Sequence, residues 1–436
     1  MRAVIRLVDI LGFALFWAAF AAMLAAVFLV SSALPRKRRR AARTVSRFSF
    51  PVYDLISHKY DSIAEDALLN GYIAKDHYVY LDFGHGFDRY ENIEDRIFFR
   101  SVAAHPDNAL YGAGFRGMSA LMTEMKILRI SFMTIWGKGI DFIKAHDPHL
   151  LGLNGILLAR LFRVPLVIHL NSDFDMKYLG VGRVSAPLLV SRELERLLES
   201  AVIQAADMVV ADRKLYSRSK SFPKKSLAKY RAVGVRVDRT HYAPLDSRRD
   251  LRKDLGLEGK RILLYVGRLH DVKYPKDAIA AFAAVKARID HAVLLVVGSG
   301  DLRRQLEEMT RSLGLADSVI FLGRKGYGDL INIFSTADLF LAPHGGVTLV
   351  ESALAGTPIV AYDFDWHSEF LEDGKMGGLV RFRDAEAMGR KAVEILMDEG
   401  LRSKMSRYCR EAALERCSRE RSVENERGVY DQLLGA

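Results

Sequence analysis

Cysteine is scarce in this sequence, which has two among its 436 residues, Cys409 and Cys417. Two cysteines cannot build the disulfide framework of a small secreted domain, and neither has a histidine or cysteine at metal-ligand spacing. We therefore predict two inert thiols in a reducing compartment. Low-complexity tracts are also missing, and a content of 50% hydrophobic and 27% charged residues is that of a folded chain. The length accommodates two domains of ordinary size and a short extra segment.

The sequence also lacks a basic stripe interleaved with aromatic residues, which is typical of a nucleic-acid-binding surface. The formal net charge is +11, but much of the excess is local. Six lysines and arginines gather between Arg36 and Arg43, directly after an apolar stretch. We predict no nucleic-acid partner.

Charge is absent from residues 10–35, a run long enough to cross a hydrocarbon core of about 30 Å as a helix. The sequence predicts a transmembrane anchor over 4–34, and the basic cluster behind it keeps the remaining chain on the cytoplasmic side. A cleaved signal peptide is the alternative, since Arg2 and Arg6 precede the run and Ser32-Ala33 is small. The length of the run and the cluster favour a single-pass protein of the inner (cell) membrane with cytoplasmic domains.

Short apolar runs alternate with helical patterns in two series along the rest of the chain. The first series, over 48–245, predicts strands at 78–81, 142–143, 164–168 and 208–211 and helices at 153–162 and 188–206. The second series, over 246–415, predicts strands at 261–266, 292–297, 319–322, 339–341 and 358–361 and helices at 275–288, 302–313, 327–336 and 348–355.

This rhythm of strand, helix and strand implies parallel pairing with crossover helices. We predict an α/β fold with two Rossmann-like, doubly wound domains, over 48–245 and 246–415. Residues 416–436 form a C-terminal helix that could pack back on the first domain. Ligands are expected in a cleft at the carboxyl ends of the strands.

Two cations follow the first strand of the second series. Arg268 comes directly after Val266-Gly267, and Lys273 lies five residues further on. A strand-end arginine and a loop lysine can neutralise a departing diphosphate without a metal. Two solvated loop cations are the alternative.

A glycine-backed turn joins a later strand to a helix, in the sequence His344-Gly345-Gly346-Val347-Thr348. Paired glycines let the backbone approach a ligand, and the helix start offers free N–H groups. Glu351 could accept the hydroxyls of a ribose, although Thr348-x-x-Glu351 is also a capping box. Gly298-Ser299-Gly300 is half of a dinucleotide fingerprint and a weak signal by itself.

In this order the motifs resemble the donor-binding half of glycosyltransferase family 4, closely over 261–383 and more loosely at 141–148, 165–173 and 206–207. The resemblance implies a GT-B fold and a metal-independent, retaining hexosyltransferase. Arg268 and Lys273 would hold the diphosphate, and Glu351 would bind the ribose. The other expected contacts of the nucleotide sugar are Gly267, Gly298, His344, Gly345, Gly346, Val347 and Thr348.

The sequence departs from the family at two positions. Pro343 stands where the first glutamate of the Glu-x7-Glu motif is expected, and His344 is the nearest polar group. Asn171 stands where the family commonly carries a sugar-facing histidine, and His169 is two residues earlier. Asn171 can bond a sugar hydroxyl but does not titrate near neutral pH, so His146, at a neighbouring strand end, is the second candidate.

Two Asp-x-Asp pairs, Asp173-Phe174-Asp175 and Asp363-Phe364-Asp365, match the metal motif of another transferase class. The pattern is common by chance, and we predict no metal and no cofactor beyond the nucleotide sugar. An apolar stretch over 118–133, dotted with arginine and lysine, is interpreted as a buried helix-loop-helix, with contact to a bilayer as the alternative.

These expectations converge on a membrane-anchored transferase that moves a sugar from a nucleotide diphosphate to a lipid-linked or growing surface glycan. Two rivals stay open. One is a catalytically silent GT-B scaffold of a polysaccharide-assembly complex, which Pro343 and Asn171 keep plausible. The other is a non-transferring GT-B enzyme such as a nucleotide-sugar epimerase.

Overall fold

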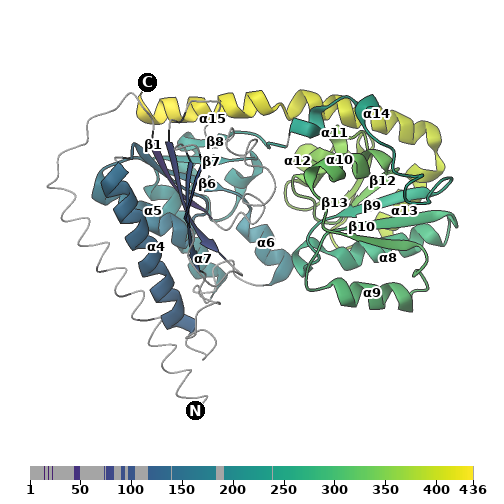
Figure 1. Cartoon of the computed structure of the whole chain (residues 1–436), viewed down its shortest axis with the longest axis horizontal. Helices are drawn as coiled ribbons and strands as arrows, with labels where there is room; N and C mark the ends of the chain where they lie inside the picture. The colour runs from purple at the N-terminus through teal and green to yellow at the C-terminus, as the bar shows by residue number, and fades with distance from the viewer. Residues whose placement is uncertain are drawn as a thin grey trace, which may run out of the picture. The chain divides into compact units, whose positions relative to one another are not determined.

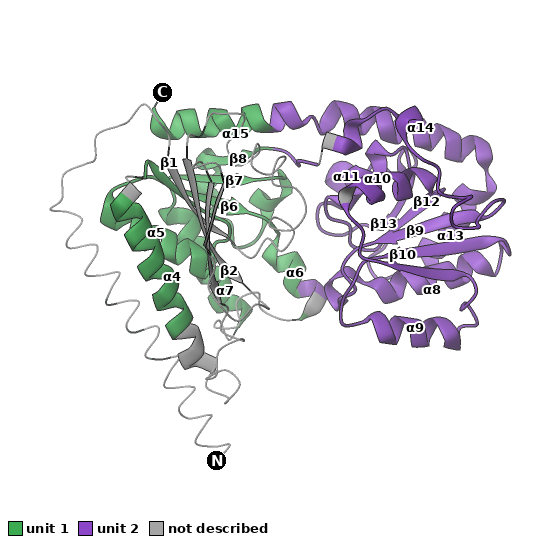
Figure 2. Ribbon diagram, viewed as in Figure 1, with its two compact units in different colours: residues 1–178, 182–233, 423–436 green, residues 179–181, 234–422 purple. Residues whose placement is uncertain are grey.

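The computed structural model describes residues 44–49, 73, 75–82, 90–93, 97–103, 116–138, 140–182, 191–237 and 239–435, with three helical positions at 14, 18 and 22. The chain divides into two compact units (Figure 2). Unit 1 comprises 1–178, 182–233 and 423–436, and unit 2 comprises 179–181 and 234–422.

Unit 1 is built on an eight-stranded sheet of order β3-β4-β2-β1-β5-β6-β7-β8 (Figure 1). Neighbouring strands pair in parallel, except that β3 runs antiparallel to β4. The strands are β1 (Thr44–Ser49), β2 (Lys75–Asp82), β3 (Tyr90–Ile93), β4 (Ile97–Ala103), β5 (Phe142–Ala145), β6 (Leu166–Leu170), β7 (Met208–Ala211) and β8 (Tyr230–Ala232).

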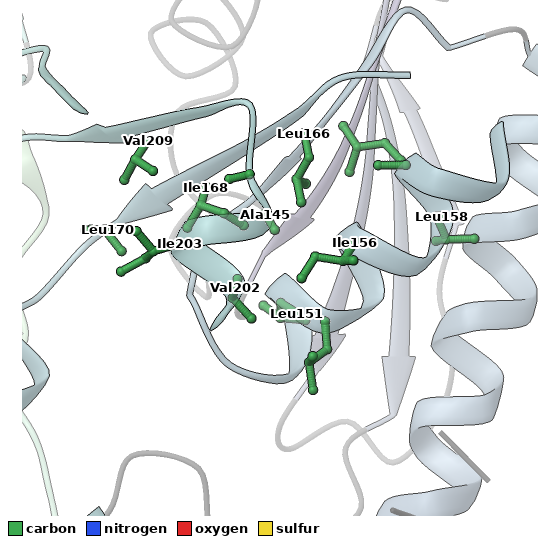
Figure 3. Packing of buried hydrophobic residues seen from close by; sticks show 14 of the residues in the cluster. Ala145, Leu151, Ile156, Leu158, Leu166, Ile168, Leu170, Val202, Ile203 and Val209 are labelled. Carbon is green, nitrogen blue, oxygen red and sulfur yellow. The ribbon is translucent and has the colours of Figure 1, made fainter. Parts of the chain in front are cut away.

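The helices of unit 1 cover this sheet and complete its core. They are α4 (Arg116–Lys138), α5 (Leu150–Phe162), α6 (Phe174–Val181) and α7 (Arg192–Ala205), with 3-10 turns η2 (Leu215–Arg218) and η3 (Lys224–Lys229). Figure 3 shows Leu151 and Ile156 of α5 among Ile168 of β6 and Val202 of α7. All residues of β5, β6 and β7 are buried, as expected for parallel strands covered on both faces.

The C-terminal helix α15 (Arg419–Leu434) contributes its residues from Val423 onward to unit 1. The Tyr430 ring packs 4.7 Å from the Phe142 ring of β5, measured between centroids. The ammonium of Lys144, also on β5, lies 2.5 Å from a carboxylate oxygen of Glu426, and both side chains are buried. The first unit therefore needs residues from both ends of the described chain.

Unit 2 is built on a six-stranded parallel sheet of order β11-β10-β9-β12-β13-β14. The strands are β9 (Arg261–Val266), β10 (Ala292–Val297), β11 (Val319–Gly323), β12 (Leu339–Ala342), β13 (Ile359–Tyr362) and β14 (Gly377–Val380). The helices are α8 (Pro275–Lys286), α9 (Arg303–Ser312), α10 (Tyr327–Thr336), α11 (Thr348–Leu354), α12 (His367–Phe370), α13 (Ala385–Met397) and α14 (Glu399–Arg416), with 3-10 turns η4 (Arg239–Tyr242), η5 (Leu245–Ser247) and η6 (Asp271–Lys273).

Local sequence signals explain several of these boundaries. Helix α8 starts with Pro275, whose missing N–H costs nothing in a first turn. The carboxylates of Asp384 and Asp398 accept the backbone N–H groups of Ala387 and Leu401, each at 2.8 Å, and so cap α13 and α14. The Asp398 cap thus separates α13 from α14, which otherwise follow each other almost without a break.

Two sequence-based expectations differ from the structure, and a third falls outside the described residues. The stretch 118–133 lies within the single 23-residue helix α4 and is not a helix-loop-helix, because its residues leave no break in the helical pattern. It is also not fully buried, since several of its apolar side chains are exposed. Residues 234–245, expected at the end of the first domain, belong to unit 2. The predicted anchor at 4–34 lies outside the described residues apart from positions 14, 18 and 22. None of the helices in the described ranges has the length and apolarity to span a membrane.

Candidate functional site

The candidate donor site of unit 2 lies at the carboxyl edge of its sheet. The strands run in parallel, so the loops after β9, β10, β12 and β13 all emerge at this edge. These loops carry Gly267–Lys273, Gly298–Gly300, Pro343–Val347 and Asp363–Trp366. The sequence motifs of the second series are therefore brought to one place by topology.

Lys273 lies against the glycine-backed turn after β12. Its ammonium nitrogen is 3.3 Å from the carbonyl oxygen of His344. A methyl group added to Gly346 would lie 3.8 Å from the same nitrogen. Gly346, Val347 and Thr348 are partly or fully exposed, so a cation and accessible backbone face solvent side by side. This arrangement suits an anionic ligand.

Arg268 is placed differently from Lys273. Its side chain is exposed and makes no hydrogen bond or ion pair with any described residue. The Tyr265 hydroxyl fixes the backbone of this loop, because it lies 3.4 Å from the Arg268 carbonyl and 3.3 Å from the Lys273 carbonyl. Burial raises the pKa of Tyr265 well above its usual range, so the hydroxyl keeps its proton as a donor. Sequence reasoning did not single out Tyr265, which reads as an ordinary strand residue.

Gly298 and Gly300 serve close packing between two loops. Gly298 has φ 142°, and a Cβ atom there would lie 1.9 Å from the Gly267 carbonyl oxygen. The Leu269 N–H donates to the Ser299 carbonyl at 2.9 Å, which holds the loops after β9 and β10 together. The close approach of the two loops thus explains why glycine stands at both positions of the incomplete fingerprint.

His344 is half-buried beside Lys273, with a neighbouring oxygen at each ring nitrogen. Burial, and then the nearby Lys273 ammonium, lower the pKa of His344. The Nδ1–H donates to the Val272 carbonyl at 2.6 Å, and Nε2 lies 3.5 Å from a carboxylate oxygen of Asp365. Val272, Asp365 and the turn therefore hold this ring in place.

His367, at the start of α12, supports the same turn. Its ring nitrogens lie 2.7 Å from the Tyr362 carbonyl and 3.2 Å from the Gly345 carbonyl. Two carbonyls would favour a charged ring, but burial and the neighbouring His344 outweigh them and lower the pKa of His367 to about 4. The Trp366 indole N–H also donates to Gly345, at 3.3 Å. Neither side chain was identified from the sequence.

Glu351 lies in the first turn of α11 and is buried. One of its carboxylate oxygens is 3.6 Å from Nε2 of His241, which is buried in the 3-10 turn η4. The alternative capping box is not formed, because Val347 occupies the N-cap and gives no side-chain cap. The carboxylate stands one helical turn behind the exposed backbone of Val347 and Thr348.

The carboxyl edge of the unit 1 sheet carries side chains instead of glycine turns. The rings of His146 and His169 stack with centroids 5.1 Å apart. His169 Nε2 lies 3.1 Å from a carboxylate oxygen of Asp212, which follows β7. The exposed Asn171 donates to the His146 carbonyl at 2.7 Å. The two candidates Asn171 and His146 are thus neighbours, and Asp212 is an addition that sequence reasoning missed.

A buried charge network lies behind this edge. Arg192 donates to Glu195 at 2.7 Å, to both oxygens of Glu199 and to Asp175 at 3.0 Å. His149 joins it through Glu199 at 2.9 Å. Within the described residues, His149, Glu195 and Glu199 converge as a metal site would, but both carboxylates already accept hydrogen bonds from the Arg192 guanidinium.

The first Asp-x-Asp pair is also engaged within the protein. Asp173 caps α6 by accepting the N–H groups of Asp175 and Met176 at 2.9 and 3.2 Å. Asp175 binds the guanidinium of Arg196 at 2.7 Å as well as Arg192. In the second pair, Asp363 is exposed and Asp365 faces His344. The two pairs do not present paired carboxylates as a metal motif would.

Comparison with known proteins also distinguishes the two units, because the matching sequence profile lies within unit 2. The sequence profile described as "Glycosyl transferases group 1" matches residues 247–412. A D-inositol 3-phosphate glycosyltransferase of Salinispora arenicola is 30% identical over 320 residues, which cover 68% of this chain and 69% of that protein. The chain belongs to the group 1 glycosyltransferases. The alpha-monoglucosyldiacylglycerol synthase of Streptococcus pneumoniae is 26% identical over 253 residues, 55% of this chain and 56% of the synthase, so the chain spans about half the length of this relative.

Solved structures extend the likeness of this glycosyltransferase to both units. The sucrose-phosphate synthase of Thermosynechococcus elongatus has a TM-score of 0.72 at 20% identity and covers 90% of this chain and 99% of its own. The Anabaena protein HepE, solved in complex with UDP-glucose, has a TM-score of 0.63 at 17% identity, with 90% and 100% covered. At these identities the likeness shows the fold, which is the predicted GT-B type.

Proposed function

We propose that this glycosyltransferase moves a hexosyl group from a nucleotide diphosphate sugar to a lipid-linked or growing surface glycan. The observation that carries the proposal is the contact between Lys273 and the His344–Gly346 turn at the carboxyl edge of unit 2. A fixed ammonium beside accessible backbone can stabilise the negative charge that develops on a departing nucleotide diphosphate. The exposed, unpaired Arg268 on the same loop supplies a second cation.

The transfer is proposed to be retaining and to need no metal. Two cations of the chain take the part that a metal plays in other transferases. Neutral His344 replaces the glutamate that Pro343 displaces, and its fixed ring can contact the donor sugar. Turnover that persists in a chelator, and a product with the anomeric configuration of the donor, would support these two features.

The acceptor is proposed to be reached at a lipid surface. Helix α4 exposes Met122, Met125, Met133 and Trp136, which follow one another at spacings of three, eight and three residues and so share a face. Exposed basic Lys126 and Arg129 lie on the same face, where they can contact anionic headgroups. The pneumococcal relative is named for a glucosylated diacylglycerol. The anchor predicted at 4–34 would keep the protein in the cell membrane, with its units in the cytoplasm.

Purified full-length protein incubated with radiolabelled UDP- and GDP-sugars and membrane lipids tests the proposal. We expect transfer from one donor, and we expect Lys273→Ala to lower it by about 100- to 1000-fold, as loss of one charge-stabilising group does. Lys404→Ala, at an exposed position of α14, is the matched control and should retain activity.

Two outcomes would contradict this proposal, and each would support a different function. Donor binding without turnover, together with stable recovery of partner proteins, would identify a silent scaffold. Conversion of free nucleotide sugar without an acceptor would identify an epimerase-type enzyme.

A further inference from the structure

Unit 2 contains a cavity of about 840 Å³ that the proposed transfer does not use. It is lined by the start of β9, by residues just before β10, β12 and β13, and by one face of α14. These are the amino ends of the strands, whereas the donor site lies at their carboxyl ends. The six residues of β9 separate the two edges by roughly 20 Å.

The lining of this cavity is strongly basic. Seven lysine and arginine side chains line it, against the two carboxylates of Asp250 and Asp338. Asp338 is buried and shared among three guanidiniums, at 2.5 Å from Arg402, 3.2 Å from Arg252 and 3.8 Å from Arg261. Arg252 also binds Asp250 at 3.0 Å, and Arg261 and Arg402 both bind Glu399, so carboxylates match these three guanidiniums. The excess positive charge comes from the other cations of the lining.

Arg248 adds a charge that has no carboxylate partner. Its guanidinium donates to Ser335 Oγ at 2.9 Å and to the carbonyls of His241 and Leu354 at 2.7 and 3.2 Å. Arg410 donates to the same two carbonyls, and neither arginine forms an ion pair with a described residue. Burial and the charge of Arg410 lower the pKa of Arg248 to about 10. An anion in the cavity would relieve this repulsion.

Two further cations stand at the rim. Lys260 precedes β9, and Arg407 lies on α14; both are exposed, line the cavity and make no side-chain hydrogen bond or ion pair within the described chain. Long cationic side chains with nothing to bind are common on a surface, but here they border a cavity that is already positive.

We propose that this cavity is a second anion site, which binds a ligand carrying two or more phosphate groups. Guanidinium forks match the geometry of phosphate oxygens, and three lining cations without a carboxylate partner among the described residues, Arg248, Lys260 and Arg407, call for a multivalent anion. The volume is that of a small-molecule site and exceeds what a single phosphate fills. The ligand is either a free oligophosphate or a phosphorylated lipid headgroup, which share this chemistry.

Binding of inorganic tripolyphosphate to the full-length protein, measured by calorimetry, tests the site. We expect Lys260→Ala/Arg407→Ala to weaken binding at least about tenfold, since each lost phosphate contact costs affinity. The matched control is Lys253→Ala/Lys404→Ala, which removes the same charge from the same two segments at exposed positions outside the cavity. Lys273→Ala should leave the affinity within twofold of the parent, which separates this site from the donor site.

A second arm uses vesicles of phosphatidylcholine with and without phosphatidic acid. Cavity-dependent binding of tripolyphosphate identifies a free ligand, and cavity-dependent binding of the phosphatidic acid vesicles alone identifies a headgroup; either supports the proposal. Equal weakening in the cavity and control pairs, or no binding of either probe, would overturn it. All four substituted residues are exposed, so the variants should fold, and unchanged thermal unfolding confirms this.

Discussion

The two units of this glycosyltransferase handle charge in opposite ways. Among the described residues, unit 1 buries nine lysine, arginine, aspartate and glutamate side chains, whereas unit 2 buries three. Unit 1 pairs these groups inside its core, as in the Lys144–Glu426 contact. Unit 2 keeps its cations at both edges of the sheet and builds its site from glycine backbone. Unit 1 is therefore stabilised by specific ion pairs and unit 2 by close backbone packing. Loss of an ion-pair partner should destabilise unit 1, and added volume at a packed glycine should destabilise unit 2.

The largest effect is expected from removing one partner of the buried pair in unit 1. Glu426→Ala leaves the Lys144 ammonium buried without its carboxylate and should lower the free energy of unfolding by about 3–5 kcal/mol. Urea unfolding measures the loss. Glu424→Ala, at an exposed position of the same helix, should change stability by less than about 0.5 kcal/mol. Equal stability of the two variants would show that α15 does not rely on this contact.

The corresponding change in unit 2 adds a single methyl group. Gly298→Ala places a Cβ 1.9 Å from the Gly267 carbonyl at a positive φ, and should cost about 3 kcal/mol through overpacking and backbone strain. Gly326→Ala is the control, because no atom lies within 4 Å of its added Cβ and its φ is −75°. A tolerated Gly298→Ala would contradict the close packing of the two loops.

Acidification should separate the two units further. Burial raises the pKa of Glu124, on α4 of unit 1, to about 7, whereas burial lowers the pKa of His367 in unit 2 to about 4. As pH falls from 6.5 to 4.5, the folded form of unit 1 takes up a proton at Glu124 that the unfolded form does not bind, and gains stability. Unit 2 loses stability over the same window, because only its unfolded form protonates His367. Each change is about 3 kcal/mol at most.

Hydrogen exchange of peptides covering β6 and β12, followed against urea at both pH values, reads the two units separately. Glu124→Gln should flatten the response of unit 1, and His367→Gln that of unit 2. Responses of the same sign in both parent units would refute the opposed titration.

The smallest expected effect concerns the exposed stripe of α4. In vesicles containing a photoactivatable phospholipid, the reconstituted full chain should be labelled on α4 about tenfold more than on α7, which exposes Leu194 and Leu197. Met125→Glu/Met133→Glu should remove the difference. Mass spectrometry of the peptides measures the labelling. Equal labelling of both helices in the parent protein would argue against a lipid-facing role of α4.

The sequence predicts the strands and helices of unit 2 closely from β9 to β13, but it does not predict α12, β14, α13 or α14. The bounds of β9, β10 and α10 agree with the expected ones, because continuous apolar runs between glycines, prolines and charges mark buried parallel strands and their crossovers. The parallel topology then brings Lys273 to the Gly345–Gly346 turn. Local pattern and simple topology suffice for that much of the candidate site.

Contacts between distant side chains are not contained in such patterns. Lys144 and Glu426 are 282 residues apart, and nothing in either neighbourhood marks the other as a partner. His241 lies in the 3-10 turn η4 and His367 in the four-residue helix α12, and the sequence pattern predicts neither element. The helix α4 was misread because an apolar stretch predicts burial, although its own residues divide between a buried and an exposed face.

The place of α15 in unit 1 has a consequence for biosynthesis. Strand β5 emerges from the ribosome long before Val423–Leu434, which belong to the same unit. Until those residues are made, Lys144 and Phe142 lack the partners that cover them, while the segments of unit 2 up to Ser422 are already complete. The order of folding should therefore invert the order of translation, with the later unit consolidating first.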